Sequence, residues 1–229
     1  MDASRHRSDT RAAIFDVDGV LVDSYRAHFE AWQRLGREFG RDLAEERFAA
    51  SFGRRNAELM DELWEGAVPS DQVDTWGDWK EARYREILLA DFPAMAGAAE
   101  LIDALKAAGF RLAVGSSGPP ENVACALEGL GRAGAFDATV DGSEVVRGKP
   151  DPEVFLTAAA KLGVEPARCA VFEDALAGVE AARRAGMTPI ALVGTAPRER
   201  LAEHAALVVD SLREVTPQRV AELIDAANA

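Results

Sequence analysis

Short apolar segments alternate with amphipathic helical segments over most of the chain. The apolar segments are three to five residues long, as is typical of strands buried on both faces of a sheet. They lie at residues 12–15, 112–115, 138–140, 169–172, 189–193 and 206–209. Apolar positions at helical spacing between them predict helices at 97–110, 152–162 and 175–185. This alternation predicts βαβ units, and therefore an α/β fold with a parallel sheet and helices on both of its faces.

Residues 24–93 interrupt this alternation, because no stretch among them has the pattern of a strand. Helical patterns occur at 27–39, 57–64 and 79–89, with a tryptophan-rich loop expected at 68–78. All four tryptophans of the chain lie in this segment, where we expect them to form a small core. We therefore predict two domains: residues 1–23 with 94–229 as the α/β core, and residues 24–93 as an all-helical domain inserted after the first strand. Such an insert would act as a lid over the mouth of the sheet.

Composition and charge exclude several classes of protein. The chain has 229 residues, 48% of them hydrophobic, and a formal net charge of −13. That charge disfavours nucleic acid as a partner, because nucleic-acid-binding proteins neutralise phosphates with a basic face. No apolar stretch approaches the ~20 residues of a membrane helix, and residues 1–10 lack the apolar core of a signal peptide. We expect a cytoplasmic protein, either a monomer or a homodimer, that binds neither membrane nor nucleic acid.

Four polar clusters mark the candidate site. Three of them follow predicted strands directly: Asp16-Val17-Asp18-Gly19, Ser116-Ser117-Gly118 and Glu173-Asp174. The fourth is Lys149, which precedes the helix-start signal Pro150-Asp151-Pro152. Because ligands bind at the carboxyl ends of parallel strands, we expect these side chains to converge at one edge of the sheet.

Each cluster also has a structural alternative. The Asp16–Gly19 stretch has the composition of a surface turn, and a lone lysine before proline is ordinarily solvated. Asp174 could be the N-cap of the following helix, whereas Glu173 has no comparable structural role. The order of the four clusters is what favours the functional interpretation.

The four clusters in this order resemble the haloacid dehalogenase superfamily, and the helical insert resembles the cap of its phosphatase and β-phosphoglucomutase branch. The resemblance implies a Rossmann-like core, with Asp16 as the nucleophile that attacks phosphorus and Asp18 as the acid/base. It also implies that Ser116 and Lys149 are catalytic, with Ser117 and Gly118 binding the phosphoryl group near a helix that opens at the two following prolines.

Magnesium is the cofactor that this chemistry needs. A carboxylate and a phosphate oxygen ~4 Å apart repel each other by about 4 kcal/mol per unit-charge pair at an effective dielectric constant near 20. Mg²⁺ removes that repulsion and prefers oxygen ligands. The expected metal ligands are Asp16, Asp18 through its backbone carbonyl, Glu173 and Asp174.

Asp18 narrows the reaction to phosphoryl transfer, since dehalogenating members of the superfamily lack this second aspartate and transport ATPases have threonine there. The favoured function is a phosphatase for a small phosphorylated metabolite, with a sugar phosphate as the expected substrate. A sugar phosphomutase is the alternative, and a catalytically silent binding protein on the same fold is the third reading.

The helical insert bears on this choice. The segment with His28 and Trp32 resembles the cap of β-phosphoglucomutases, and Lys80 matches a cap lysine of that group. Asn56 departs from the mutase pattern, which has an arginine there to hold a second phosphate, and Arg54 or Arg55 could substitute for it. The expected substrate-binding residues of the insert are therefore His28, Trp32, Arg54, Arg55 and Lys80. For His28, a place on the helix surface or in domain packing is the favoured alternative.

Overall fold

The computed structural model describes residues 10–51, 56–64 and 68–228. The chain divides into two compact units. The first contains Met1–Asp23 and Ala94–Ala229, and the second contains Ser24–Pro93.

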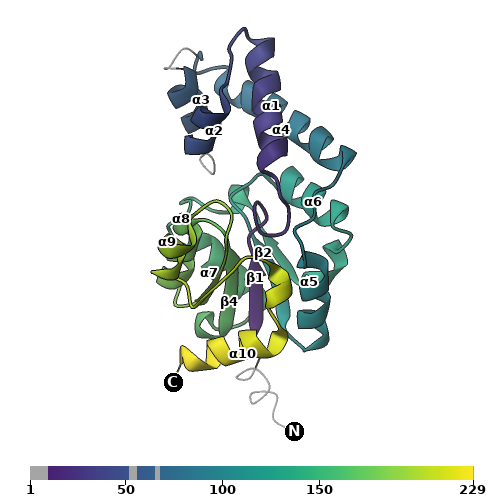
Figure 1. Cartoon of the computed structure of the whole chain (residues 1–229), viewed down its shortest axis with the longest axis vertical. Helices are drawn as coiled ribbons and strands as arrows, with labels where there is room; N and C mark the ends of the chain where they lie inside the picture. The colour runs from purple at the N-terminus through teal and green to yellow at the C-terminus, as the bar shows by residue number, and fades with distance from the viewer. Residues whose placement is uncertain (1–9, 52–55, 65–67, 229) are drawn as a thin grey trace. The chain divides into compact units, whose positions relative to one another are not determined.

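The first unit is built on a six-stranded sheet in which every neighbouring pair of strands is parallel. The strand order is β3-β2-β1-β4-β5-β6, so β1 lies between β2 and β4 (Figure 1). The bounds are β1 Ala12–Phe15, β2 Arg111–Gly115, β3 Ala138–Val140, β4 Cys169–Glu173, β5 Thr188–Leu192 and β6 Leu207–Val209. Each lies within a residue or two of the predicted strand. Strands β1, β4 and β5 are buried along their whole length, and a continuous apolar run is what a strand buried on both faces requires.

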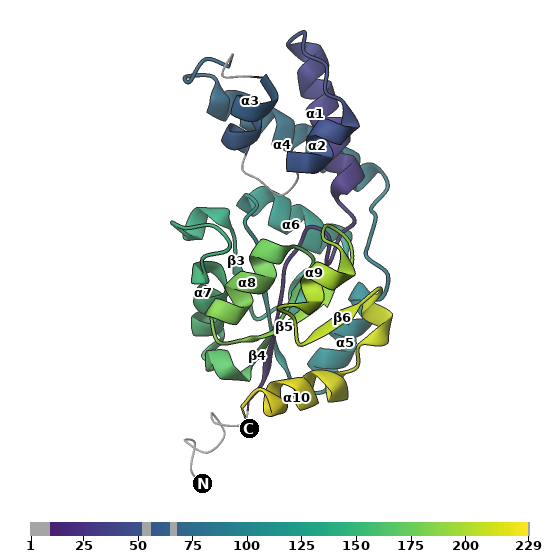
Figure 2. The ribbon, with the colours of Figure 1, turned by 60° about the vertical axis from the view of Figure 1, so that its left-hand side comes forward.

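Helices cover both faces of this sheet (Figures 1 and 2). Helices α7 and α8 pack on one face, where their apolar residues join Ala12 and Ile14 of β1 in a single core. Helices α5 and α10 contact β2, β4 and each other on the opposite face. The helices of this unit are α5 Ala98–Ala107, α6 Pro120–Gly129, α7 Glu153–Leu162, α8 Leu176–Arg184, α9 Arg198–Ala202 and α10 Pro217–Ala226. Short 3₁₀ helices lie at η1 Ala133–Ala135, η2 Gly142–Glu144, η3 Pro166–Arg168 and η4 Leu212–Glu214. The predicted α/β architecture is confirmed.

The second unit has helices and no strand among its described residues. Its helices are α1 Tyr25–Glu38, α2 Glu45–Ser51, α3 Asn56–Trp64 and α4 Val73–Ala90. Three tryptophans, Trp32, Trp64 and Trp76, lie in its hydrophobic core, as expected. Trp32 and Trp76 each pack edge-on against Trp64.

The predicted loop at 68–78 is wrong in its second half, because α4 already begins at Val73. Trp76, Lys80, Tyr84 and Leu88 recur every four residues and are all buried, so they form one packed face of α4. That burial outweighs the low helix propensity of glycine and aspartate near the start of the helix.

No helix in the ranges 10–51, 56–64 and 68–228 is both long and apolar enough to cross a bilayer.

Candidate active site

Two adjacent strands bring the first and fourth polar clusters together. Strands β1 and β4 pair in register, with Phe15 opposite Phe172, and the Asp16 N–H donates to the Phe172 carbonyl at 3.0 Å. Asp16, which follows β1, therefore emerges beside Glu173 and Asp174, which lie at the end of β4. The parallel register thus places both acidic clusters at the carboxyl edge of the sheet.

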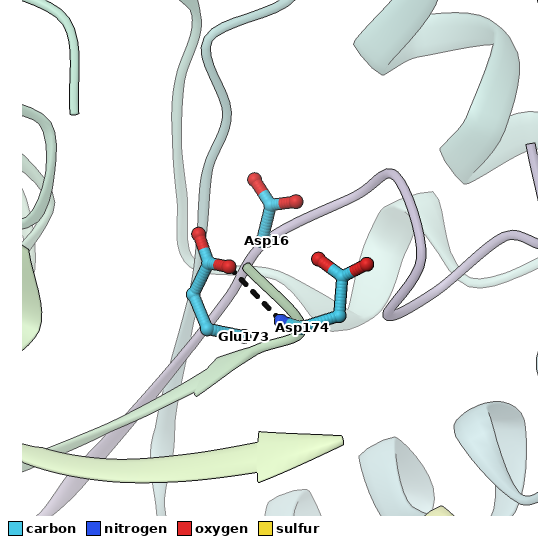
Figure 3. Close-up of side chains that lie close together, drawn as sticks. All are labelled: Asp16, Glu173 and Asp174. Atoms are coloured by element: carbon cyan, nitrogen blue, oxygen red, sulfur yellow. Dashed lines mark hydrogen bonds between the residues drawn. The ribbon is translucent and has the colours of Figure 1, made fainter. Parts of the chain in front are cut away.

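The three carboxylates of Asp16, Glu173 and Asp174 form one cluster. A ligand oxygen from each lies within 4.8 Å of the others, and all three side chains are buried. Figure 3 shows the three carboxyl groups projecting in the same direction from the ends of their strands. Because Asp16 is buried in this cluster, the surface-turn alternative for the first motif does not hold.

Lys149 joins the ends of three strands. Its Nζ donates to Asp16 Oδ1 at 2.7 Å, to Glu173 Oε1 at 2.6 Å and to the Gly115 carbonyl at the end of β2 at 3.3 Å. The side chain is only 10% exposed, and its ammonium lies 4.8 Å from the centre of the Phe155 ring. Lys149 is therefore a buried partner of the carboxylates rather than a solvated surface lysine.

The electrostatics of the cluster are dominated by burial of like charges. Burial raises the pKa of Asp16 well above its usual value, Glu173 and Asp18 raise it further, and Lys149 opposes the rise. Burial and the neighbouring Glu173 raise the pKa of Asp174 to about 7. Burial alone would lower the pKa of Lys149, but the carboxylates of Asp16 and Glu173 hold it above its usual value. One ammonium does not compensate these carboxylates, and a divalent cation would relieve the excess negative charge.

The structure reverses the capping roles expected at the fourth cluster. Glu173 Oε2 accepts the backbone N–H groups of Asp174 at 2.9 Å and Ala175 at 3.0 Å, so this carboxylate organises the turn before α8. The N-cap position of α8 is Ala175, and Asp174 Oδ2 instead accepts a hydrogen bond from the hydroxyl of Thr195. The N-cap alternative considered for Asp174 is therefore wrong, and Glu173 is the residue that binds the backbone of this turn, because its side chain is long enough to fold back onto it.

The second cluster forms a loop between β2 and α6. Ser116 is buried, and its Oγ accepts the Gly118 N–H at 3.0 Å. The loop is fixed to the next strand, because the Ser116 N–H donates to the Val140 carbonyl at 3.0 Å and the Gly142 N–H donates to the Gly118 carbonyl at 2.8 Å. Helix α6 begins at Pro120, as the two prolines predict. Ser116 is also close to Lys149 along the backbone, because the carbonyl of the preceding residue, Gly115, accepts a hydrogen bond from Lys149.

Asp18 lies in the tight turn after β1. The turn is closed by hydrogen bonds from the Gly19 N–H to the Val22 carbonyl at 2.8 Å and from the Leu21 N–H to the Val17 carbonyl at 2.9 Å. Asp18 is close enough to the cluster to raise the pKa values of both Asp16 and Asp174.

The helical unit contains a second polar network, made of its own residues. Lys80 Nζ lies 2.8 Å from His28 Nδ1 and donates to Glu81 Oε1 at 2.9 Å. Asn56 Nδ2 donates to the same Glu81 oxygen at 2.8 Å, and the His28 ring stacks on Tyr84 with 3.9 Å between ring centres. His28 and Lys80, predicted separately, are therefore direct partners. Glu81 was missed, although its position next to Lys80 on a helix was the available signal.

The other predicted residues of the insert do not join this network as expected. Trp32 is 1% exposed in the hydrophobic core, and Lys80 Nζ lies 5.5 Å from the centre of its ring. This placement favours a packing role beneath Lys80 over direct contact with a substrate. Arg54 and Arg55 lie outside the described residues.

Known proteins match this chain along most of its length. A family model described as haloacid dehalogenase-like hydrolase matches residues 10–186. The validoxylamine A 7'-phosphate phosphatase of Streptomyces hygroscopicus subsp. limoneus is 36% identical over 87% of this chain and 93% of the relative. The phosphorylated carbohydrates phosphatase of Thermotoga maritima is 31% identical over 78% of this chain and 83% of the relative. Among solved structures, the β-phosphoglucomutase of Clostridium difficile superposes with a TM-score of 0.83 at 27% identity, covering 95% of this chain and 98% of the other.

Proposed function

Because this chain belongs to the haloacid dehalogenase-like hydrolase family, we propose that it is a Mg²⁺-dependent phosphatase that hydrolyses a phosphate monoester of a small metabolite. The names of its phosphatase relatives favour a phosphorylated sugar or a related polyol as the substrate. The observation that carries the proposal is Lys149, which pairs with Asp16 and Glu173 at the point where the ends of β1, β2 and β4 meet.

Asp16 is the proposed nucleophile. Its carboxylate oxygen forms a bond to phosphorus while the bond from phosphorus to the ester oxygen breaks, which gives an aspartyl phosphate. Asp18 donates a proton to the departing oxygen, and then takes a proton from the water that attacks the aspartyl phosphate. Inorganic phosphate leaves, and both carboxyl groups return to their starting states.

Residues beside Asp16 supply the proposed phosphoryl site. The Ser116 hydroxyl and the Ser117 and Gly118 amides precede the N-terminus of α6, where backbone N–H groups favour an anion. Lys149 adds a positive charge next to Asp16, and its hydrogen bonds to two carboxylates fix the position of its ammonium. A positive group preorganised in this way stabilises the charge that develops on the phosphoryl oxygens.

The donor set at the acidic cluster fits Mg²⁺. Buried carboxylate oxygens are hard ligands, and their excess of negative charge over Lys149 favours a small divalent cation. Asp16, Asp174, the backbone carbonyl of Asp18 and Glu173 are the proposed ligands. When bound, Mg²⁺ supplies Lewis-acid neutralisation of the charge between the nucleophile and the phosphoryl group.

The helical unit, Ser24–Pro93, is the proposed cap, and its polar network favours a phosphatase over a mutase. At the position where the mutase pattern has a phosphate-binding arginine, Asn56 presents an uncharged amide that is bonded to the Glu81 carboxylate. Glu81 also pairs with Lys80, so a carboxylate accompanies the lysine of this network. A carboxylate there disfavours a second phosphate and tolerates the hydroxyl groups of an uncharged leaving group. We propose that His28 and Lys80, together with Arg54 and Arg55, recognise that leaving group, with Trp32 supporting Lys80.

A sugar phosphomutase is the second candidate, favoured by the direct pairing of His28 with Lys80 and by the similarity to a β-phosphoglucomutase structure. A mutase would convert a hexose 1-phosphate into the 6-phosphate and would need a bisphosphate activator. A phosphatase releases inorganic phosphate without one.

The test is a phosphate-release screen over sugar phosphates, polyol phosphates and short organic phosphates, with Mg²⁺ or with a chelator. We expect release that depends on Mg²⁺, and loss of that release in Asp16→Asn, which keeps the shape of the side chain but lacks a nucleophilic carboxylate. Rapid quenching of the wild-type reaction should trap phosphate on Asp16. The hydrolase proposal fails if the folded protein with Mg²⁺ releases no phosphate from any ester of the panel, or if Asp16→Asn is as active as the wild type.

A further inference from the structure

Thr195 contacts the acidic cluster from the loop after β5, a strand that is followed by none of the four motifs. It lies in the loop between β5, which ends at Leu192, and α9, which begins at Arg198. Its hydroxyl Oγ1 donates a hydrogen bond to Asp174 Oδ2. Strand β5 is the neighbour of β4, so this loop emerges at the same edge of the sheet as Glu173 and Asp174.

The side chain of Asp174 is confined on two sides. Gly19, at a φ of +78°, approaches so closely that a Cβ atom on it would lie 2.1 Å from Asp174 Oδ2. Thr195 binds the same oxygen, and Asp174 as a residue is 3% exposed. Oδ2 is therefore held between the turn of the first motif and the loop after β5, and Oδ1 would lie 3.1 Å from the same Cβ position.

The loop that carries Thr195 is itself anchored. The Val193 N–H donates to the Val209 carbonyl at 2.9 Å, and Ala196 is buried in a cluster with Val179 and Leu201. Arg198 Nη1 donates to the Val208 carbonyl at 3.0 Å, immediately after the loop. Contacts to β6 on both sides therefore fix the position from which the Thr195 hydroxyl reaches Asp174.

We propose that Thr195 is a positioning residue for the metal site, which orients Asp174 so that one of its oxygens faces Mg²⁺. This inference rests on the proposed function, because it takes Asp174 as a metal ligand. Hydrogen bonds to a ligating carboxylate lock its orientation before the metal arrives, and removing such a bond typically weakens metal binding by about 10–100-fold.

A merely structural role makes the opposite prediction for metal affinity. If the hydroxyl only satisfied a buried carboxylate, its loss would destabilise the metal-free protein and leave Asp174 with a greater need for a cation. Magnesium affinity would then stay the same or rise. The two roles can therefore be separated by the sign of the change in the dissociation constant for Mg²⁺.

The experiment measures Mg²⁺ binding by isothermal titration calorimetry on metal-free full-length protein, together with urea unfolding in the absence of metal. Thr195→Val keeps the size and β-branch of the side chain without the hydroxyl, and Thr195→Ser keeps the hydroxyl without the methyl group. Thr139→Val makes the same chemical change on the edge strand β3, three strands away from β4 in the sheet order, and controls for the general effect of the substitution.

We expect Thr195→Val to raise the dissociation constant for Mg²⁺ about 10-fold or more. Thr195→Ser and Thr139→Val should remain close to the wild type. Turnover of Thr195→Val should recover towards the wild-type value as Mg²⁺ is raised to saturation, because the groups that contact the phosphoryl group are unchanged. If Thr195→Val does not fold, Thr195→Ala carries the same measurement.

An unchanged or tighter dissociation constant in the hydroxyl-free variant, with wild-type protein that binds Mg²⁺, would overturn the positioning role and leave the phosphatase proposal intact. A ten-fold loss that appears equally in Thr195→Ser would also overturn it, because the hydroxyl would then not be the cause. If the wild-type protein binds no Mg²⁺, the metal-dependent function fails, and this inference fails with it.

Discussion

Replacing Lys149 by methionine tests the centre of the proposed site. Methionine keeps an unbranched side chain that can pack against Phe155, and removes only the ammonium that binds Asp16 at 2.7 Å and Glu173 at 2.6 Å. The change therefore isolates the charge from the packing. It leaves Asp16, Glu173 and Asp174 without their cationic partner in a buried cluster.

The size of the effect follows from the geometry. At these distances, each ion pair has a Coulomb attraction of about 6 kcal/mol at an effective dielectric constant near 20. The cost of desolvating the ammonium offsets much of this, so removing one partner of a buried pair typically costs about 3–5 kcal/mol. Proton uptake by the carboxylates limits the loss further. Since native domains are stable by about 5–15 kcal/mol, we expect Lys149→Met to be destabilised but folded. Turnover should fall by about 10²–10³, as when one preorganised donor is removed from an oxyanion site.

The assay pairs steady-state phosphate release at saturating Mg²⁺ with urea unfolding followed by far-ultraviolet circular dichroism. Tryptophan fluorescence would report unfolding of the helical unit and not of the unit that contains Lys149, because all four tryptophans lie within Ser24–Pro93. Lys161→Met is the matched control: Lys161 pairs with Glu144 at an exposed site, so its loss should change stability far less and leave turnover unchanged. Near wild-type turnover in a folded Lys149→Met protein would refute the role assigned to this lysine.

Three further predictions concern the same core. Gly19→Ala should lower the free energy of unfolding by about 1–3 kcal/mol, because alanine strains the backbone at this positive φ, and should also lower Mg²⁺ affinity, because the added Cβ would collide with Asp174. Gly186 has a similar positive φ but open space around it, so Gly186→Ala should lower stability without changing Mg²⁺ affinity. Urea unfolding and calorimetric titration with Mg²⁺ measure the two effects. Magnesium at 100 times its dissociation constant should stabilise the wild type by about 2.7 kcal/mol and raise its Tm by roughly 5–11 °C, and an unchanged Tm would argue against a metal site in the folded protein. Cys169, whose pKa burial raises to about 12, should resist iodoacetamide at pH 8 until the protein is unfolded, and rapid labelling of the native protein would contradict its placement in β4.

The sheet could be predicted from the sequence because its strands β1, β4 and β5 are buried along their whole length. A strand such as Cys169–Glu173, covered on both faces, needs a continuous apolar run, and the polar residues that follow such runs mark the functional edge. The pattern was less informative in the helical unit, where the start of α4 at Val73 depends on packing partners that lie elsewhere in the chain. The predicted loop was therefore wrong where tertiary contacts decide the start of the helix.

The residue types of the candidate site could be read from the sequence, but the hydrogen-bonding role of each residue could not. Whether Glu173 or Asp174 caps the turn depends on side-chain reach in three dimensions, and the structure gave the role to Glu173. Thr195 could not be found from a motif, because its contact with Asp174 crosses from one strand end to the next and joins residues 21 positions apart. Lys149 was predicted because it occurs in the sequence together with the three other polar clusters. In the structure it contacts residues at the ends of three strands, β1, β2 and β4.

The energetics of the cluster argue that its charges are kept for chemistry rather than for stability. Asp16, Glu173 and Asp174 are buried together, and Lys149 is the cation that the described structure places among them. Replacing a buried ion pair by apolar residues of similar volume is often neutral or stabilising, so packing alone gives no reason to gather carboxylates here. The raised pKa values of Asp16 and Asp174 reflect this cost, because burial disfavours the ionised form of these two carboxyl groups in the folded protein. A bound divalent cation would offset this cost, so a cluster that is unfavourable without metal is also where the proposed function is expected.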